Sequence, residues 1–119
     1  MNIRMLNVRS LATALLFSLS ISPALAEEEG KITILSPKDG AEVDVNKPVM
    51  VSFEAVWGPK GNHLHLYLDN HRLDVIRQPR GSEDIHNVLM VGKHEICLEI
   101  ETSWHFSTGV RQCVTVTAK

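Results

Sequence analysis

Short runs of alternating apolar and polar residues dominate the chain from about position 30 to its end. The clearest run is HLHLYL at positions 63–68, in which three leucines alternate with two histidines and a tyrosine. A period of two predicts a β-strand, because successive side chains of a strand point to opposite faces of its sheet. We therefore expect the leucines to face a core, and the histidines and the tyrosine to face outward.

Six further segments have the composition of strands, and turn residues such as glycine and proline lie between them. They span residues 31–36, 49–55, 72–76, 83–89, 93–101 and 110–117. No segment between them has the 3.6-residue period of an amphipathic helix. About seven short strands without a helix predict an all-β fold, an immunoglobulin-like (fibronectin type III-like) β-sandwich. A small closed β-barrel is the alternative within the same class.

The first 26 residues have the three parts of a secretory signal peptide. Arg4 and Arg9 supply positive charge, residues 11–21 are almost wholly apolar, and residues 24–26 form an Ala-x-Ala cleavage pattern. The apolar run is shorter than the roughly 20 residues that a membrane-spanning helix needs. We expect a signal peptide at 1–26 and one domain at 27–119, periplasmic or secreted, with no membrane insertion after cleavage.

The charge balance narrows the range of partners. The chain has 12 Lys and Arg against 14 Asp and Glu. The predicted signal peptide holds two of the basic residues and none of the acidic ones, so the net charge of the exported part is about −4. A mildly acidic domain without a basic stripe is poorly suited to the phosphates of nucleic acid. We therefore expect no nucleic-acid partner.

The chain has two cysteines, Cys97 and Cys113. If the last two predicted strands form a hairpin, these residues lie opposite each other about a loop centred at position 105. An oxidising compartment favours a disulfide between them. Closing so short a loop stabilises a fold by about 3 kcal/mol in the chain-entropy model. No Cys-x-x-Cys motif supports a redox or metal-binding role instead.

Four motifs resemble those of a group of small exported bacterial domains. They are SPKDGA at 36–41, PVMVSF at 48–53, HLHLYLD at 63–69 and GKHEI at 92–96. The pattern of that group is a Ser-Pro-x-x-Gly opening, a His-x-His strand with Asp four residues on, and a Gly-x-His turn. Asn62 stands where the pattern usually has Gly, and Leu64 where some members have a third His. The resemblance implies an immunoglobulin or fibronectin type III-like fold and export, and it assigns no activity.

His63 and His65 are the strongest candidates for chemistry in this sequence. Residues i and i+2 of a strand share a face, with side chains about 7 Å apart, which is close enough to bind one ion. Such binding requires neutral imidazole, so we expect the ion to be released as the pH falls below about 6. The alternative is that both histidines are ordinary polar residues on the outer side of a half-exposed strand.

Further candidate ligands lie on a neighbouring predicted strand. In an immunoglobulin-like sheet, the strand with the two histidines runs beside the end of the strand at 93–101, which carries two glutamates. The loop after that strand brings a third histidine to the same end. Imidazoles with carboxylates nearby suit Cu(II) or Zn(II). The predicted metal ligands are His63, His65, His105, Glu99 and Glu101.

The same end of the sandwich supports a second interpretation, contact with a protein or a small ligand through aromatic side chains. The aromatic residues expected at this surface are Tyr67, Trp57 and Trp104. For His94, in the Gly-x-His turn, we expect a structural role with hydrogen bonds to the backbone. His71 and His86 are expected to be surface or boundary residues.

The sequence contains none of the hydrolase, metalloprotease or phosphate-binding motifs that mark an enzyme. A domain of this size also has little room for a deep pocket that excludes water. We predict a binding module, not an enzyme, that holds copper or zinc. The alternative is a metal-independent interaction or accessory domain that contacts an envelope protein. Imidazole nitrogens that converge would favour the metal site, and splayed rings would favour the alternative.

Overall fold

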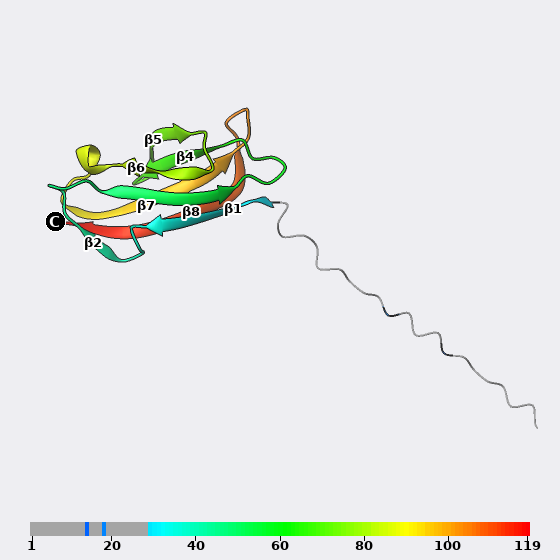
Figure 1. Cartoon of the computed structure of the whole chain (residues 1–119), viewed down its shortest axis with the longest axis horizontal. Coiled ribbons are helices and arrows are strands. Elements are labelled where there is room, and N and C mark those ends of the chain that lie inside the picture. Colours follow the sequence, from blue (N-terminus) through cyan, green and yellow to red (C-terminus); the bar gives the residue numbers. More distant parts are fainter. Residues whose placement is uncertain (1–13, 15–17, 19–28) are drawn as a thin grey trace, which may run out of the picture.

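Two β-sheets packed face to face form the domain (Figure 1). The structure is a computed structural model that describes residues 14, 18 and 29–119. One sheet has the strand order β1 (Lys31–Ser36), β3 (Met50–Val56), β6 (Arg80–Asp84). The other sheet has the order β2 (Ala41–Val43), β8 (Ser107–Ala118), β7 (Gly92–Glu101), β4 (His63–Leu68), β5 (His71–Ile76). The prediction of an all-β sandwich is confirmed, whereas the signal-peptide prediction lies almost wholly outside the described residues.

The strand predictions were wrong in two places. β2 has three residues and pairs in parallel with β8, and its length is too short for a period of two to be recognised. The segment 83–89 was predicted as one strand. Instead β6 ends at Asp84, and a short 3-10 helix, η2 (His86–Val88), follows it. Among the described residues, no helix is long and apolar enough to cross a membrane.

The core lies between the two sheets, and the side chains on one face of β4 form part of it. Leu64, Leu66 and Leu68 are buried there, as the alternation predicts, and the opposing sheet contributes Val51 and Phe53. Burying a leucine side chain completely stabilises a fold by about 1.5–3 kcal/mol. β4 is therefore firmly held from its core side, which fixes the positions of the side chains on its other face.

The pairing of β4, β7 and β8 follows the predicted register. His63 lies opposite Glu101 and His65 opposite Glu99 across the β4–β7 ladder. Cys97 and Cys113 are directly opposed across the β7–β8 ladder and form a disulfide, which confirms that prediction. The bond ties the two longest strands together on the face of the sheet that points away from the core.

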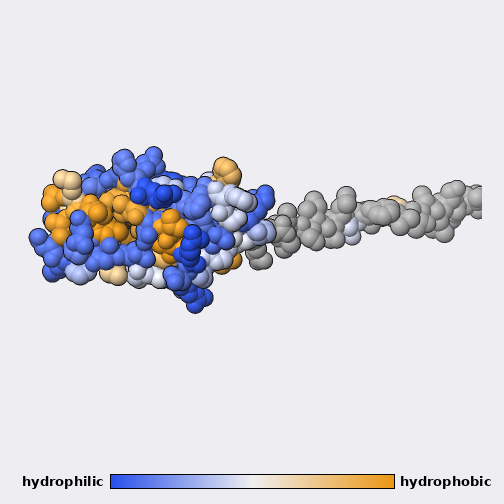
Figure 2. Space-filling model, turned by 90° about the horizontal axis from the view of Figure 1, so that it is seen from above, coloured by the Kyte–Doolittle hydropathy of each residue, from blue (hydrophilic) through white to orange (hydrophobic). Residues whose placement is uncertain are grey.

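Apolar side chains also gather on part of the surface, among hydrophilic neighbours (Figure 2). Met90 and Val91, which precede β7, are 75% and 71% exposed. Trp104 and Phe106, in the loop between β7 and β8, are 80% and 71% exposed. This second pair flanks one of the candidate metal ligands in sequence.

Candidate metal centre

The chain enters β4 through a turn that has no room for a side chain. A Cβ atom on Gly61 would lie 2.0 Å from the carbonyl oxygen of Trp57, so only glycine fits at this position. The amide of Asn62 donates to the carbonyl of Glu101 at 2.9 Å. This hydrogen bond fixes the start of β4 beside the end of β7, and His63 is the next residue.

The loop between β7 and β8 presents His105 from the other side. The amide of Thr102 donates to the carbonyl of Phe106 at 2.7 Å, and the amide of His105 donates to the carbonyl of Thr102 at 3.0 Å. His105 has a φ of 61°, in the left-handed region, which histidine adopts more readily than most residues. The tight turn directs this ring back over β4.

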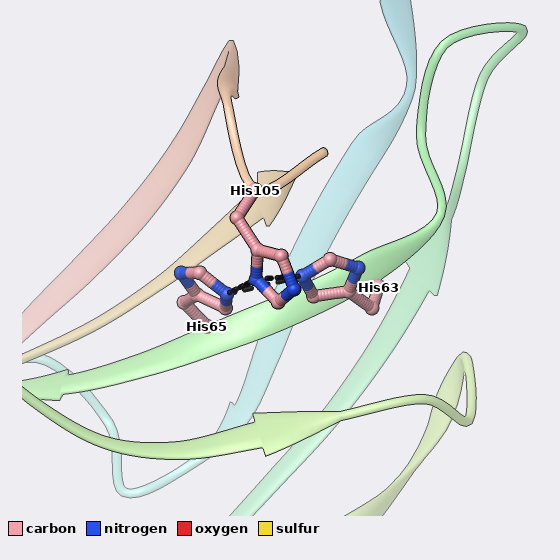
Figure 3. Close-up of side chains that lie close together, drawn as sticks. All are labelled: His63, His65 and His105. Carbon is pink, nitrogen blue, oxygen red and sulfur yellow. Dashed lines mark hydrogen bonds between the residues drawn. The ribbon is translucent and has the colours of Figure 1, made fainter. Parts of the chain in front are cut away.

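Three imidazole nitrogens converge where β4 meets this loop (Figure 3). Nε2 of His63 lies 3.0 Å from Nε2 of His65 and 3.2 Å from Nδ1 of His105. Nε2 of His65 lies 3.1 Å from the same Nδ1. The three atoms form a nearly equilateral triangle. The rings therefore converge, which is the geometry that favours the metal site over the metal-independent alternative.

The triangle has the dimensions of a metal site. Around a tetrahedral ion with Zn–N bonds of about 2.0–2.1 Å, ligand nitrogens lie about 3.3 Å apart. The observed separations of 3.0, 3.1 and 3.2 Å are only slightly shorter. An ion bonded equally to all three would sit about 1 Å above their plane. Small shifts of the rings are enough to admit it.

Oxygen atoms lie behind the rings of the two strand histidines. Nδ1 of His63 donates to Oδ1 of Asn62 at 2.9 Å. Nδ1 of His65 lies 3.4 Å from Oε1 of Glu101 and 3.3 Å from the hydroxyl of Tyr67. The proton that Nδ1 of His63 donates leaves its Nε2 with a lone pair. In the tautomer of His65 whose Nδ1 also donates, two lone pairs face each other at 3.0 Å, an arrangement that a cation between them relieves.

Both strand histidines are buried, which differs from the sequence-based expectation. His63 is 0% and His65 3% exposed, although both lie on the face of β4 opposite the core leucines. Alternation along a strand predicts which face a residue occupies, and it does not reveal that a loop and a neighbouring strand cover that face. The two rings contact each other and the polar groups of His105, Glu101 and Tyr67.

Burial changes the ionisation of this cluster. Burial and the nearby imidazole of His105 lower the pKa of His63, and burial together with His63 lowers the pKa of His65 to about 4. Burial and the neighbouring Glu99 raise the pKa of Glu101 to about 8. The imidazole rings of His63 and His65 are therefore neutral at physiological pH, and neutral imidazole is the form that binds a metal.

The two glutamates differ in their positions. Glu101 is buried behind His65, on the side away from the nitrogen triangle. Glu99 is partly exposed and pairs with Arg111 at 3.2 Å. At this site, the donor atoms that lie within 4.8 Å of one another are those of the three histidines. Glu101 is placed to orient a ligand ring, and Glu99 is placed next to Glu101.

The three aromatic residues predicted to form a contact surface differ in their surroundings. Trp57 is partly buried against the hydrophobic core. Tyr67 lies beneath the guanidinium of Arg111, which is 4.9 Å from the centre of its ring, and Tyr67 also contacts His65. Trp104 is largely exposed in the loop beside His105. Its neighbour Phe106, which the sequence analysis did not select, is exposed in the same loop.

Two motifs of the family resemblance, HLHLYLD and GKHEI, also meet at the opposite end of β4. Nδ1 of His94 donates to the carboxylate of Asp69, and Nε2 donates to the carbonyl of Met90 at 2.6 Å. The expected backbone hydrogen bond of His94 is thus present. Its partner Asp69 was not predicted, although the motif that carries Asp69 was recognised. His86 pairs with Asp84 at the end of β6, and His71 is exposed.

Comparison with solved structures identifies the fold. The fibronectin(III)-like modules of Clostridium thermocellum CbhA superpose on the chain with a TM-score of 0.60 and 16% sequence identity. The match covers 74% of this chain and 95% of that chain. No protein-family model and no curated protein sequence matches the chain. The fibronectin type III-like fold implied by the sequence resemblance is confirmed, and this similarity extends to the fold alone.

Proposed function

We propose that the chain is a small exported binding module that holds one transition-metal ion, copper or zinc, between His63, His65 and His105. The observation that supports this most strongly is the triangle of nitrogens with separations of 3.0–3.2 Å. Nitrogen ligands suit both Zn(II) and Cu(II). In this proposal Glu101 is not a ligand but an acceptor that orients His65.

Export is part of the proposal and has two supports. Residues 1–26 have the pattern of a signal peptide, and a disulfide links Cys97 to Cys113. Disulfides persist in oxidising compartments such as the bacterial periplasm. The N-terminal sequence of protein recovered from the periplasm or the medium tests this, and it is expected to begin at Glu27.

Metal titration of the purified domain 27–119 tests the proposed site. We expect one Cu(II) or Zn(II) per chain, measured by calorimetry and by metal analysis after gel filtration. Replacing both strand ligands, His63→Ala with His65→Ala, should abolish binding at this site. His105→Asn, which tolerates the left-handed backbone but removes the imidazole, should weaken it at least tenfold.

An exposed histidine outside the triangle provides the control. His71→Gln removes an imidazole from the start of β5 and should leave both stoichiometry and affinity unchanged. Circular dichroism of each variant reports whether the sandwich still forms. Unchanged affinity in the folded double variant of His63 and His65 would rule out the site.

A second candidate function is a metal-independent contact with an envelope protein. The observation in its favour is the pair of aromatic side chains in the β7–β8 loop, Trp104 and Phe106, which are 80% and 71% exposed. Aromatic residues are enriched in protein interfaces. This candidate predicts that a specific partner is retained in the presence of a chelator and is lost on Trp104→Ala.

A further inference from the structure

The nitrogen triangle supplies three ligands, and the neighbouring polar side chains contact the other nitrogens of the two strand histidines. Oδ1 of Asn62 accepts from the far nitrogen of His63. Oε1 of Glu101 and the hydroxyl of Tyr67 both lie at the far nitrogen of His65. The Nδ1 and Nε2 atoms of one ring point in different directions, so these oxygens face away from an ion on the Nε2 side. Within residues 29–119, the donor group that can share one ion there has three members.

Zinc with three protein ligands keeps a fourth position for a small molecule, whereas a site with four protein ligands is closed. His105 is the exposed member of the triangle, and the two strand histidines are buried. We therefore place the open position on the side of His105. A small ligand would therefore reach the ion next to the β7–β8 loop.

Two arginines, one on the edge strand β5 and one directly after it, lie near this position by register. Arg72 lies opposite Tyr67 across the β4–β5 ladder, and directly paired residues of a ladder point to the same face. Arg77 follows the end of β5, two residues beyond Val75, which lies opposite His65. Both arginines are exposed, and neither forms an ion pair with another of the residues that the structure describes.

The β4–β5 register sets where these arginines lie. Continued one residue past its last pair, Leu64 and Ile76, it puts Arg77 beside His63, as it puts Arg72 beside Tyr67. A third arginine on this face, Arg111, is already occupied by Glu99, Asn70 and the ring of Tyr67. Arg72 and Arg77 thus have donors available to an anion that approaches the ion.

We propose that the ion held by His63, His65 and His105 has one coordination position filled from outside the chain, and that Arg72 and Arg77 select a small anion for it. This inference rests on the proposed function. The class of ligand is a small anion with an oxygen or nitrogen donor, such as a carboxylate. Its charge is attracted both by the metal and by the two guanidinium groups.

Azide binding to the Cu(II)-loaded domain tests the proposal, because azide bound to copper gives a charge-transfer band in the near ultraviolet. Metal stoichiometry is measured first, so that failure to bind copper is read separately from failure to bind azide. At constant ionic strength, we expect a saturable band with one azide per copper. Replacing both arginines, Arg72→Gln with Arg77→Gln, should weaken azide binding by about fivefold to tenfold and leave one copper per chain.

Arg80→Gln is the matched control, because it removes the same charge from the exposed start of β6 in the other sheet. It should leave azide affinity unchanged. A copper-loaded domain whose spectrum does not respond to azide would overturn the open position. Azide that removes the copper into the filtrate would overturn it as well. Equal effects of the Arg80 change and the Arg72 and Arg77 changes would overturn the role of the two arginines.

Discussion

At the scale of single residues, the two strand histidines are held by oxygens at their far nitrogens. Asn62 accepts from His63, and Glu101 lies behind His65. Such acceptors fix the tautomer and the orientation of a ligand ring and increase its basicity. The quality of the proposed site therefore depends on residues that do not touch the ion.

Replacing Asn62 with alanine tests this dependence. Loss of the acceptor frees the ring of His63 to rotate and to exchange tautomers, so we expect metal affinity to fall by about tenfold. Competition with a chelator of known affinity measures the change. Asn46→Ala, at an exposed asparagine outside the site, is the control. Equal affinities of the two variants would contradict the orienting role of Asn62.

The low pKa values of the strand histidines predict how the site responds to acid. Burial lowers the pKa of His65 to about 4 and that of His63 below the ordinary 6.5. A lowered pKa means less protonation at a given pH, so protons compete weakly with the metal at these two nitrogens. We expect the ion to be retained at pH 6 and released only in more acidic solution, below the value that unperturbed imidazole suggests.

Release is measured by dialysing the loaded domain against buffers of decreasing pH and analysing the retained metal. Free imidazole bound to the same ion serves as the reference for unperturbed ligands. A release midpoint at or above pH 6.5 would contradict the effect of burial.

Part of the candidate metal site could be predicted from the sequence. The alternation at 63–68 predicted that His63 and His65 share the face opposite the leucines, and the strand pairing predicted that His105 and Glu101 lie near them. The burial of the two rings was not predictable. It depends on the turn at His105 and on the packing of Glu101, which are set by tertiary structure and leave no periodic signal in the sequence.

At the scale of elements, a second polar contact joins the β4–β5 turn to β7. The carboxylate of Asp69 accepts from Nδ1 of His94 and from the amide of Glu95 at 2.8 Å. The hydrogen bond to Asp69 raises the pKa of His94, against the smaller opposing effect of burial. This contact holds the end of β4 opposite the metal site.

Asp69→Asn, which tolerates the left-handed backbone at this position (φ 49°), should lower the free energy of unfolding by about 1 kcal/mol at pH 6, a modest value because the carboxylate is half-exposed. A histidine whose pKa is raised by folding contributes stability that is present below pH 6.5, and this stability is lost as the pH rises through the pKa of the folded state. The difference from the wild type should therefore shrink at pH 9, where the hydrogen bond to Glu95 remains. Urea unfolding at the two pH values measures it, and equal differences would contradict the ion pair.

The elements themselves differ in how far the sequence predicts them. The long hairpin of β7 and β8 carries clear alternation, and its register follows from the opposed cysteines. β2 is recognised through its parallel pairing with β8, a contact between residues 75 positions apart, as in Ala41 and Val116. Local propensity carries no information on such a pairing. Residues 83–89 have no period of two. β6 ends at Asp84, where the carboxylate accepts hydrogen bonds from the amides of Val49 and His86.

At the scale of the whole molecule, the proposed ligands come from β4 and from a loop about 40 residues later in the chain. An unfolded chain does not hold these nitrogens together, so the ion binds the folded state preferentially. Binding is therefore expected to stabilise the domain by RT ln(1 + [L]/Kd), about 2.7 kcal/mol at a hundredfold excess over Kd.

Thermal unfolding with and without Zn(II) measures this linkage. We expect the midpoint to rise with zinc concentration for the wild type. The variant carrying His63→Ala and His65→Ala should unfold at the same temperature with and without zinc, each compared with its own metal-free form. An unchanged midpoint for wild-type protein that demonstrably binds one zinc per chain would contradict a site built by folding.

β4 is covered on both sides, by apolar residues of the opposite sheet on one side and by the imidazole cluster on the other. Strands of a β-sandwich normally accept substitutions at every second position, because one face of each sheet is exposed to solvent. In a library that varies each position of the domain in turn, β4 should lack this every-other-residue tolerance. Selection for folding would then retain the leucines. Selection under metal limitation would retain the histidines between them, so that alternate positions of one short strand would be constrained by different requirements.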